Sequence, residues 1–312
     1  MVKAIVQVAN PPKCGRKEIT NRSGHLVAQL REKFLETLEE ERDNYHEDDV
    51  KKIAEDDWFV KRFLIARSRK VDDALSMIIE ALKWRKSEGI RDLKANYFPD
   101  DMFKLSQMFV YTKDKEGNLT VYFRVKYIIK IHELVPTMKK FGNYLLYLVD
   151  EVTNGNGITA VADFQGTGIQ NAEIDLLFYA ITTLRNYFPA GINHIIIVDL
   201  PWILRACWGM AKSWVPENRR KLVEFITRKQ LTDYIDIDNI PDFMGGTCKV
   251  PYAGSKVVPI GCPTTYEFCE KVLGLAPKTC EKVSNIYKPY VEALEQEQQE
   301  KDWYKNSKPL FA

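Results

Sequence analysis

The stretch that decides the fold is HIIIVDLPWILRACWGMAKSW, which runs from His194 to Trp214. It begins with a run of branched apolar residues, Ile195–Val198, which is typical of a buried strand. Pro201 follows this run, and proline is well suited to the first turn of a helix. The residues after Pro201 keep a helical period, so the stretch predicts a strand that leads directly into a helix.

The predicted helix over residues 202–214 has two different sides. Its apolar side carries residues at helical spacing, namely Ile203, Cys207, Met210, Ala211 and Trp214. Its other side carries a glycine, two basic residues and two flanking tryptophans, namely Gly209, Arg205, Lys212, Trp202 and Trp208. Because tryptophan and basic residues are frequent where proteins meet membranes, the pattern favours a lid between an apolar interior and a membrane surface.

Strand and helix patterns alternate on the N-terminal side of this stretch. Residues 108–112 and 119–125 are rich in β-branched and aromatic residues, and a turn sequence, Lys113–Asn118, joins them as a hairpin. A helix at 136–152, a strand at 158–164 and a helix at 172–187 follow. This order predicts an α/β fold with a mainly parallel, mixed sheet and right-handed crossovers. We expect the helix at 172–187 to use its apolar residues for core packing.

On the C-terminal side, the sequence predicts one more helix and one more strand. Pro216 is expected to start the helix, whose inner residues are Leu222, Phe225 and Ile226. Leu231–Ile235 is expected to form the last strand.

The chain divides into four predicted parts. Residues 1–20 are expected to form a flexible arm. Residues 21–100 hold amphipathic helix patterns at 24–42, 56–68 and 71–87 and are expected to form a small N-terminal helical domain. Residues 101–250 form the α/β domain. Residues 251–312 contain a wrapping loop and a C-terminal amphipathic helix, whose apolar stripe we expect to dock on its own domain: Val283, Ile286, Tyr290, Val291 and Leu294.

Composition excludes several classes of protein. The net charge is +2 over 312 residues, which gives no strong field for nucleic acid. The N-terminal apolar run is too short for a secretory signal, and Asp199 and Arg205 interrupt the best candidate for a membrane span. We therefore expect a cytoplasmic, monomeric protein with no nucleic-acid partner.

Enzyme chemistry finds little support in the sequence. Gly166-Thr-Gly168 lies between a strand and a helix, but the third glycine of a dinucleotide-binding loop is replaced by Asn171. Asp163 and Asp199 end neighbouring predicted strands, where polar side chains usually return to solvent. No metal-ligand spacing and no nucleophile–base set is found. We expect no catalysis, metal or cofactor; an enzyme that uses Asp163 and the Gly166–Gly168 turn is an alternative.

Several motifs together resemble one known family. Asp57–Arg67 and the helix pattern after it resemble the helical N-terminal segment of CRAL-TRIO (secretory-fourteen-like) lipid-binding proteins. Ala160–Gly166 is similar to their central strand with its D-x-x-G ending, and Tyr187–Pro189 precedes a similar strand and gate helix. Ile240–Gly246 resembles their closing L-P-x-x-x-G-G motif. The resemblance covers about residues 50–250.

The resemblance implies a hydrophobic pocket with the sheet as its floor and a gate helix over it. The gate is then residues 202–214, followed by an arm from Pro216 to Phe225. The implied lipid-binding residues are Phe123, Val125, Tyr127, Val161, Asp163, Ile203, Cys207, Met210, Trp214 and Phe225. The implied membrane-contact residues are Trp202, Arg205, Trp208, Lys212, Arg219, Arg220 and Lys221.

One branch of the family differs from this chain at three positions. Two lie in the arm, where that branch has a hydroxyl residue near Arg219 and a lysine near Lys221-Leu222. The branch that transfers phosphatidylinositol has an acidic residue directly after the Tyr-x-Pro turn, where this chain has Ala190. Residues 114–118, 124–127 and 200–204 are most similar to CRAL-TRIO domains that are joined to a motile-sperm domain.

The resemblance and the residues lead to the same expected function. We expect non-catalytic binding of a hydrophobic ligand (a phospholipid, a sterol-like or an isoprenoid lipid) and its intracellular transfer between membranes. The partners are then the lipid and, transiently, a membrane surface, with anionic lipid as one candidate. The protein is expected in the cytoplasm and peripherally on membranes. A scaffold module that binds a partner through its C-terminal helix is the other alternative.

Overall fold

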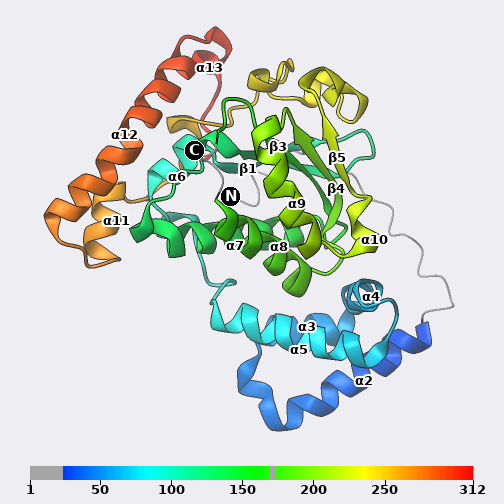
Figure 1. The fold of residues 1–312 in the computed structure, drawn as a ribbon. Helices are drawn as coiled ribbons and strands as arrows, with labels where there is room; N and C mark the ends of the chain where they lie inside the picture. The colour runs from blue at the N-terminus through cyan, green and yellow to red at the C-terminus, as the bar shows by residue number, and fades with distance from the viewer. Residues whose placement is uncertain (1–23, 169–172, 312) are drawn as a thin grey trace.

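The computed structural model describes residues 24–168 and 173–311 (Figure 1). Its N-terminal part is a unit of four helices below the α/β part in this view: α2 (Gly24–Glu41), α3 (Glu47–Glu55), α4 (Asp57–Ala66) and α5 (Val71–Ser87). The predictions for α2, α4 and α5 are confirmed within two residues, whereas α3 was not predicted. The unit has its own core, with Phe34, Phe63 and Ile78 fully buried.

Local chemistry explains where these helices begin. The Asp56 carboxylate accepts hydrogen bonds from the backbone N–H groups of Trp58 and Phe59, which caps α4. Helix α5 has Asp72 and Asp73 in its first turn and basic residues in its last, and both arrangements stabilise the helix dipole.

The second part is built on a five-stranded sheet with the spatial order β1-β2-β3-β4-β5. The hairpin of β1 and β2 is antiparallel, and the other neighbouring strands are parallel, so the predicted mixed α/β fold is confirmed. The strands are β1 (Met108–Lys113), β2 (Leu119–Arg124), β3 (Ile158–Asp163), β4 (Ile192–Val198) and β5 (Val223–Ile226).

Three helices connect the parallel strands and cover one face of the sheet (Figure 1). They are α7 (Val135–Val152), α8 (Ile174–Tyr187) and α9 (Arg205–Trp214), and α9 follows a short 3-10 turn, η7 (Trp202–Leu204). Val149 of α7 packs on Leu119, Val121 and Ile158 of the sheet. We call this side of the sheet the helix face.

The predicted end of the sheet was wrong. Pro216 is followed by a single helical turn, α10 (Glu217–Arg220). Of the residues predicted as the inner side of a longer helix, Phe225 and Ile226 lie in β5 instead, and Leu222 directly precedes it. Val223 and Phe225 lie in register with Ile195 and Ile197, because β4 offers a free edge that a short β-branched segment can pair with. The segment predicted as the last strand, Leu231–Ile235, lies in the end of a 3-10 helix, η8 (Arg228–Asp233), and in the turn after it.

The other face of the sheet, which we call the closed face, packs against the C-terminal third of the chain. Tyr122 and Val161 lie in one large core with Leu231, Met244 and Tyr252. The rest of this region comprises α6 (Asp100–Leu105) before the sheet, and α11 (Thr265–Lys271), α12 (Pro277–Gln299) and α13 (Asp302–Asn306) after it.

Helix α12 runs along one side of the molecule (Figure 1). It buries Val283, Tyr287, Val291 and Leu294 in the closed-face core, so most of the predicted apolar stripe docks on its own domain as expected. Tyr290 lies outside that stripe, with 42% of its surface exposed. Because the stripe is already covered, α12 does not offer it to a partner.

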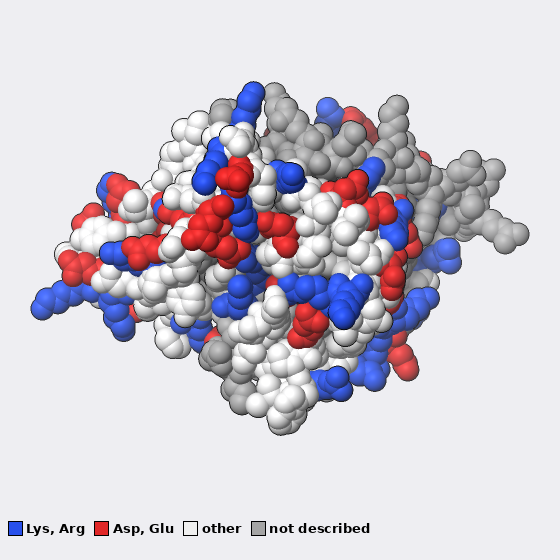
Figure 2. Space-filling view, turned by 90° about the horizontal axis from the view of Figure 1, so that it is seen from above, with Lys and Arg blue, Asp and Glu red and all other residues white. Residues whose placement is uncertain are grey.

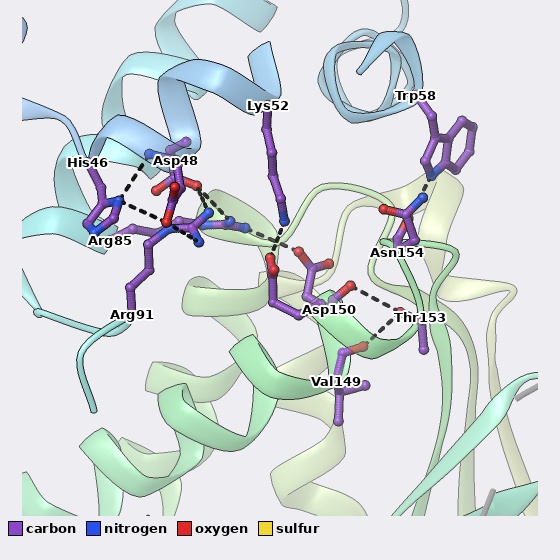
Figure 3. Close-up of polar contacts among 12 residues, drawn as sticks. His46, Asp48, Lys52, Trp58, Arg85, Arg91, Val149, Asp150, Thr153 and Asn154 are labelled. Carbon is purple, nitrogen blue, oxygen red and sulfur yellow. Dashed lines mark hydrogen bonds and ion pairs between the residues drawn. The ribbon is translucent and has the colours of Figure 1, made fainter. Parts of the chain in front are cut away.

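A buried ionic network joins the helical unit to the end of α7 (Figure 3). The Asp150 carboxylate accepts hydrogen bonds from the guanidinium groups of both Arg62 and Arg85. Lys52 forms an ion pair with Glu151, and the Trp58 indole donates to the carbonyl of Asn154 at 3.0 Å. Removing one member leaves a buried charge without its partner, so the network fixes how the two parts pack.

Within residues 24–168 and 173–311, none of the helices combines the length and the apolar character that crossing a bilayer requires.

Candidate functional site

Strand register sorts the predicted floor residues onto two faces. Phe123, Ala162, Ile197 and Phe225 are register partners across β2 to β5 and form one row on the helix face. Tyr122 and Val161 form the neighbouring row, which points to the closed face because side chains alternate along a strand. Phe123 and Phe225 therefore share a surface, and Val161 does not belong to it.

Asp163 also lies on the closed face, and it is not solvated. Its side chain is buried and pairs with Arg228, whose Nη2 lies 2.7 Å from the carboxylate. The same guanidinium binds Asp199 through Nε at 3.2 Å. The expectation that both strand-end carboxylates return to solvent is therefore wrong for Asp163. Burial raises the pKa of Asp163, while Arg228 acts in the opposite direction.

The two predicted floor residues after β2 are buried as well. Val125 and Tyr127 belong to a 3-10 turn, η4 (Val125–Tyr127). The Tyr127 ring lies in the closed-face core, 4.4 Å from the guanidinium carbon of the buried Arg124. A cation stacked on an aromatic ring is a stabilising contact, so the Tyr127 ring packs on Arg124 and does not line the helix face of the sheet.

Helix α9 presents to the protein a side that only partly agrees with the predicted one. The side chains that face inward are Leu204, just before the helix, Trp208 and Ala211. Ile203 and Met210 lie on the outer side, with 39% and 51% of their surfaces exposed. Of the predicted apolar side, Ala211 is buried and Trp214 is half-buried, so the inward side overlaps the predicted one in part and is turned toward Leu204 and Trp208.

Aromatic contacts connect α9 to its neighbours. The Trp208 ring packs edge-on against Phe225 of β5 at 5.0 Å, so this predicted membrane-contact residue faces the sheet. The Trp214 ring packs in the same manner against Phe178 of α8 at 5.0 Å. The side chain of Cys207 lies outside the described part of the structure.

Helix α8 contradicts the expectation of core packing. Only Thr183 is buried among its residues, while Leu177 and Phe178 have 42% and 46% of their surfaces exposed. These two residues were missed as site candidates. The signal was present in the run Leu176-Leu-Phe-Tyr179, because four consecutive helical residues point in all directions and cannot all face one core.

Exposed apolar side chains concentrate in this region. Among the residues that the structure describes, twelve large apolar side chains are exposed, and six of them lie on α8, η7, α9 and β5: Leu177, Phe178, Trp202, Ile203, Met210 and Phe225. We call these six residues the apolar site. A group of this kind on a monomer usually marks a binding surface for a ligand, a partner or a membrane.

The predicted basic residues divide into two groups. Arg205, Lys212 and Lys221 are exposed next to the apolar site. Arg219 is half-buried, and so is Arg220, whose Nε donates to the carbonyls of Lys212 and Val215. Arg220 therefore satisfies carbonyls at the C-terminus of α9 and joins α9 to α10.

Two hollows elsewhere do not suit an acyl chain. One lies beside β1, is lined by Met108, Phe141 and Tyr252 among others, and has space for about 60 Å³; a cavity of about 150 Å³ is needed for benzene. The other has about 650 Å³ but is lined mainly by charged residues of α3 and by Trp58 and Arg91.

The surface charge of one face of the molecule is mixed. Seen from above, Lys and Arg are interspersed with Asp and Glu, so neither sign covers that face (Figure 2).

Comparison with known proteins identifies the fold. The sequence profile of the CRAL/TRIO domain matches residues 104–246, which contain the sheet and the apolar site. The chain is 24% identical over 219 residues to the Sec14 cytosolic factor of Schizosaccharomyces pombe, which covers 63% of this chain and 76% of the relative. It is 25% identical over 237 residues to the phosphatidylinositol/phosphatidylcholine transfer protein SFH12 of Arabidopsis thaliana, covering 68% of this chain but 41% of that longer protein.

A solved structure agrees with the fold. The crystal structure of Sfh5 superposes with a TM-score of 0.53 at 17% identity, over 80% of this chain and 96% of Sfh5. The suggested closer similarity to domains joined to a motile-sperm domain stays a prediction. The sheet and the crossover helices agree with the matched profile, so residues 104–246 contain a CRAL/TRIO domain.

Proposed function

We propose that this protein binds one lipid at the apolar site and carries it between membranes without catalysis. The observation that carries the proposal is the apolar site itself, which lies in the CRAL/TRIO domain on α8, η7, α9 and β5. Helix α9 is the gate in this proposal. Phe123, Ile203, Met210, Trp214 and Phe225 keep their proposed role in lipid binding, and Leu177 and Phe178 join them.

The energetics of transfer explain why such a surface is useful. Moving one methylene group from a bilayer into water costs about 0.8 kcal/mol, so a sixteen-carbon chain costs roughly 13 kcal/mol. A protein that covers the chain with apolar side chains removes most of this barrier. The apolar site has side chains of the right kind, and a lipid lying on this site would cover Ile203 and Met210, which are exposed in this structure.

The ligand class that the relatives favour is a phospholipid. The name of SFH12 gives phosphatidylinositol and phosphatidylcholine as its cargo. Since Ala190 stands where the phosphatidylinositol-transfer branch has an acidic residue, we propose phosphatidylcholine or a similar zwitterionic lipid first. The name of the yeast relative, a cytosolic factor, favours a cytoplasmic protein that contacts membranes peripherally.

Substitution of Met210 tests lipid binding at the apolar site. Met210→Glu places a charge on the surface that the lipid must cover, so we expect the variant to lose copurified lipid while its far-UV circular dichroism stays unchanged. Ser213→Glu is the matched control, because it adds the same charge to an exposed polar position of α9. If Met210→Glu retains as much lipid as Ser213→Glu, the site is wrong.

The membrane contact has a separate test. Trp202, with 79% of its surface exposed, and the basic residues Arg205 and Lys212 form the proposed docking edge. Each basic residue adds about 1 kcal/mol of attraction to an anionic leaflet. We therefore expect the double variant Arg205→Glu/Lys212→Glu to take up lipid at least tenfold more slowly from anionic vesicles, with little change for neutral vesicles. Equal slowing with both vesicle types would exclude a charge-based contact.

A further inference from the structure

Helix α8 is packed more firmly toward its C-terminal end, at Thr183, Leu184 and Tyr187, than in its first half. Its middle has little buried surface, as Leu177 and Phe178 show, and Tyr179 makes its main polar contact with Asn143 of α7 at 2.7 Å. A helix with so few core contacts moves easily unless another element holds it.

The N-terminal helical unit holds the C-terminal end of α8. Trp84 of α5 stacks face to face on Tyr187, with ring centroids 4.3 Å apart and planes within 4°, and it meets Phe188 edge-on at 6.0 Å. Arg85, next in the chain, places its guanidinium 5.6 Å from the Phe188 ring.

A second contact holds the turn after α8. The Arg62 Nε donates to the carbonyl of Pro189 at 3.0 Å, while the same guanidinium binds Asp150 at the end of α7. Arg62 is fully buried. The helical unit thus contacts the C-terminal end of α7 and the turn after α8.

The held end of α8 is connected to α9 through the helix itself. Phe178 lies nine residues before Tyr187, or about 13 Å along the axis, and packs on Trp214. A rigid helix transmits a tilt at one end to its whole length, so the helical unit and α9 act on each other through α8.

We propose that the N-terminal helical unit braces α8 and that Trp84 is a positioning residue that limits how fast lipid leaves the apolar site. The proposal rests on the lipid-binding function proposed above. With the brace in place, the α8 wall of the site stays fixed and lipid escapes only when α9 moves. Without the Trp84 stack, α8 moves as well and offers a second way out.

The test compares two tryptophans of the same helical unit in the full-length chain. Trp84→Ala removes the stack on α8. Trp58→Ala is the matched control, because Trp58 is also largely buried and contacts the CRAL/TRIO domain at Asn154 (Figure 3), a residue that follows α7 and does not belong to α8. Trp84→Phe keeps a ring at the position and is the rescue variant.

Two measurements are made on each variant. One is amide hydrogen exchange of residues 174–187, compared at equal distance below the thermal midpoint of each variant. The other is the release rate of a fluorescent phosphatidylcholine from loaded protein to acceptor vesicles. A lost aromatic pair corresponds to roughly a two- to tenfold change in rate, so we expect Trp84→Ala to speed both exchange and release by about that factor. We expect Trp58→Ala to change neither rate. Trp84→Phe should return both rates most of the way to those of the wild-type protein.

The outcomes separate the brace from the lipid function. If amide exchange in residues 174–187 of Trp84→Ala equals that of the wild-type protein, the helical unit does not brace α8. If exchange is faster but lipid release is no faster than from Trp58→Ala, the brace exists but does not control lipid exit. If the wild-type protein takes up no lipid, the proposed function fails, and control of lipid exit fails with it. Amide exchange in α8 then still shows whether the mechanical contact exists.

Discussion

Helices α7 and α8 have the same place in the topology, yet α7 is largely buried and α8 is largely not. Both connect neighbouring parallel strands on the helix face of one sheet, and both carry many apolar residues. Helix α7 buries ten of its residues, whereas α8 buries only Thr183. The difference shows that an apolar sequence pattern alone does not determine burial. Whether the apolar residues of a helix are buried depends on the elements that pack against it.

The neighbours of the two helices account for the difference. Phe141 and Leu145 of α7 pack in a cluster with Phe98 and Phe103, which come from the segment before β1. Helix α8 has no comparable cover, because its outer neighbour is α9, a helix whose own side chains are mostly exposed. The tight half of the helix face stabilises the fold, and the loose half is free for a ligand.

The sharpest test of this comparison is the same substitution in both helices. Leu145→Ala removes a side chain that is 3% exposed, and we expect it to lower the free energy of unfolding by about 2–5 kcal/mol. Leu177→Ala, at a position that is 42% exposed, should cost less than about 1 kcal/mol and weaken lipid retention instead. Chemical unfolding of both variants measures the difference. Similar losses would mean that α8 is packed as firmly as α7.

A smaller effect tests how the ends of the two helices are held. Gly155 has φ +66°, and a Cβ there would lie 2.1 Å from Nη1 of Arg62, which contacts both ends. We expect Gly155→Ala to cost about 1–2 kcal/mol for backbone strain and more for the displaced guanidinium. Gly89→Ala is the control, because Gly89 has φ +58° and open space around it. Equal losses in thermal unfolding would show that Arg62 moves aside without cost.

The smallest expected effect is a dependence of stability on pH. Burial acts to raise the pKa of Asp150, but the Arg62 and Arg85 guanidinium groups hold it below its ordinary value of 3.8. A carboxyl with a lowered pKa contributes stability that is complete above the ordinary pKa and is lost as the pH falls through the folded value. Unfolding below about pH 4 should therefore show a loss that Asp150→Asn lacks. The same acid dependence in both proteins would assign it to other carboxyls.

Much of the scaffold follows from the sequence, because its elements are long or have strong local signals. The pattern of Val71–Ser87 predicts α5 at its observed bounds, and the turn at Lys113–Asn118 predicts the β1–β2 hairpin. Segment 223–226 was misassigned because four residues carry too little periodicity to separate strand from helix, and pairing with β4 decided the outcome.

The site was less predictable because its geometry is tertiary. The sequence around Asp163 does not indicate its partner Arg228, which lies 65 residues away at the start of η8 and contacts Asp163 only in the folded structure. The inward side of α9 is set by Phe225 and Phe178, which contact Trp208 and Trp214 from two other elements. Alternation along β2 and β3 alone would have separated Phe123 from Tyr122, but pairing register was needed to place Val161.

The central claim is that the loosely packed half of the helix face holds a single lipid. The most direct measurement is the mass of the intact, folded chain under non-denaturing conditions after incubation with phosphatidylcholine vesicles. We expect the protein mass plus one phospholipid, and the bare mass alone for Met210→Glu. A wild-type chain that shows only its bare mass, after incubation with zwitterionic and with anionic vesicles, would contradict the claim.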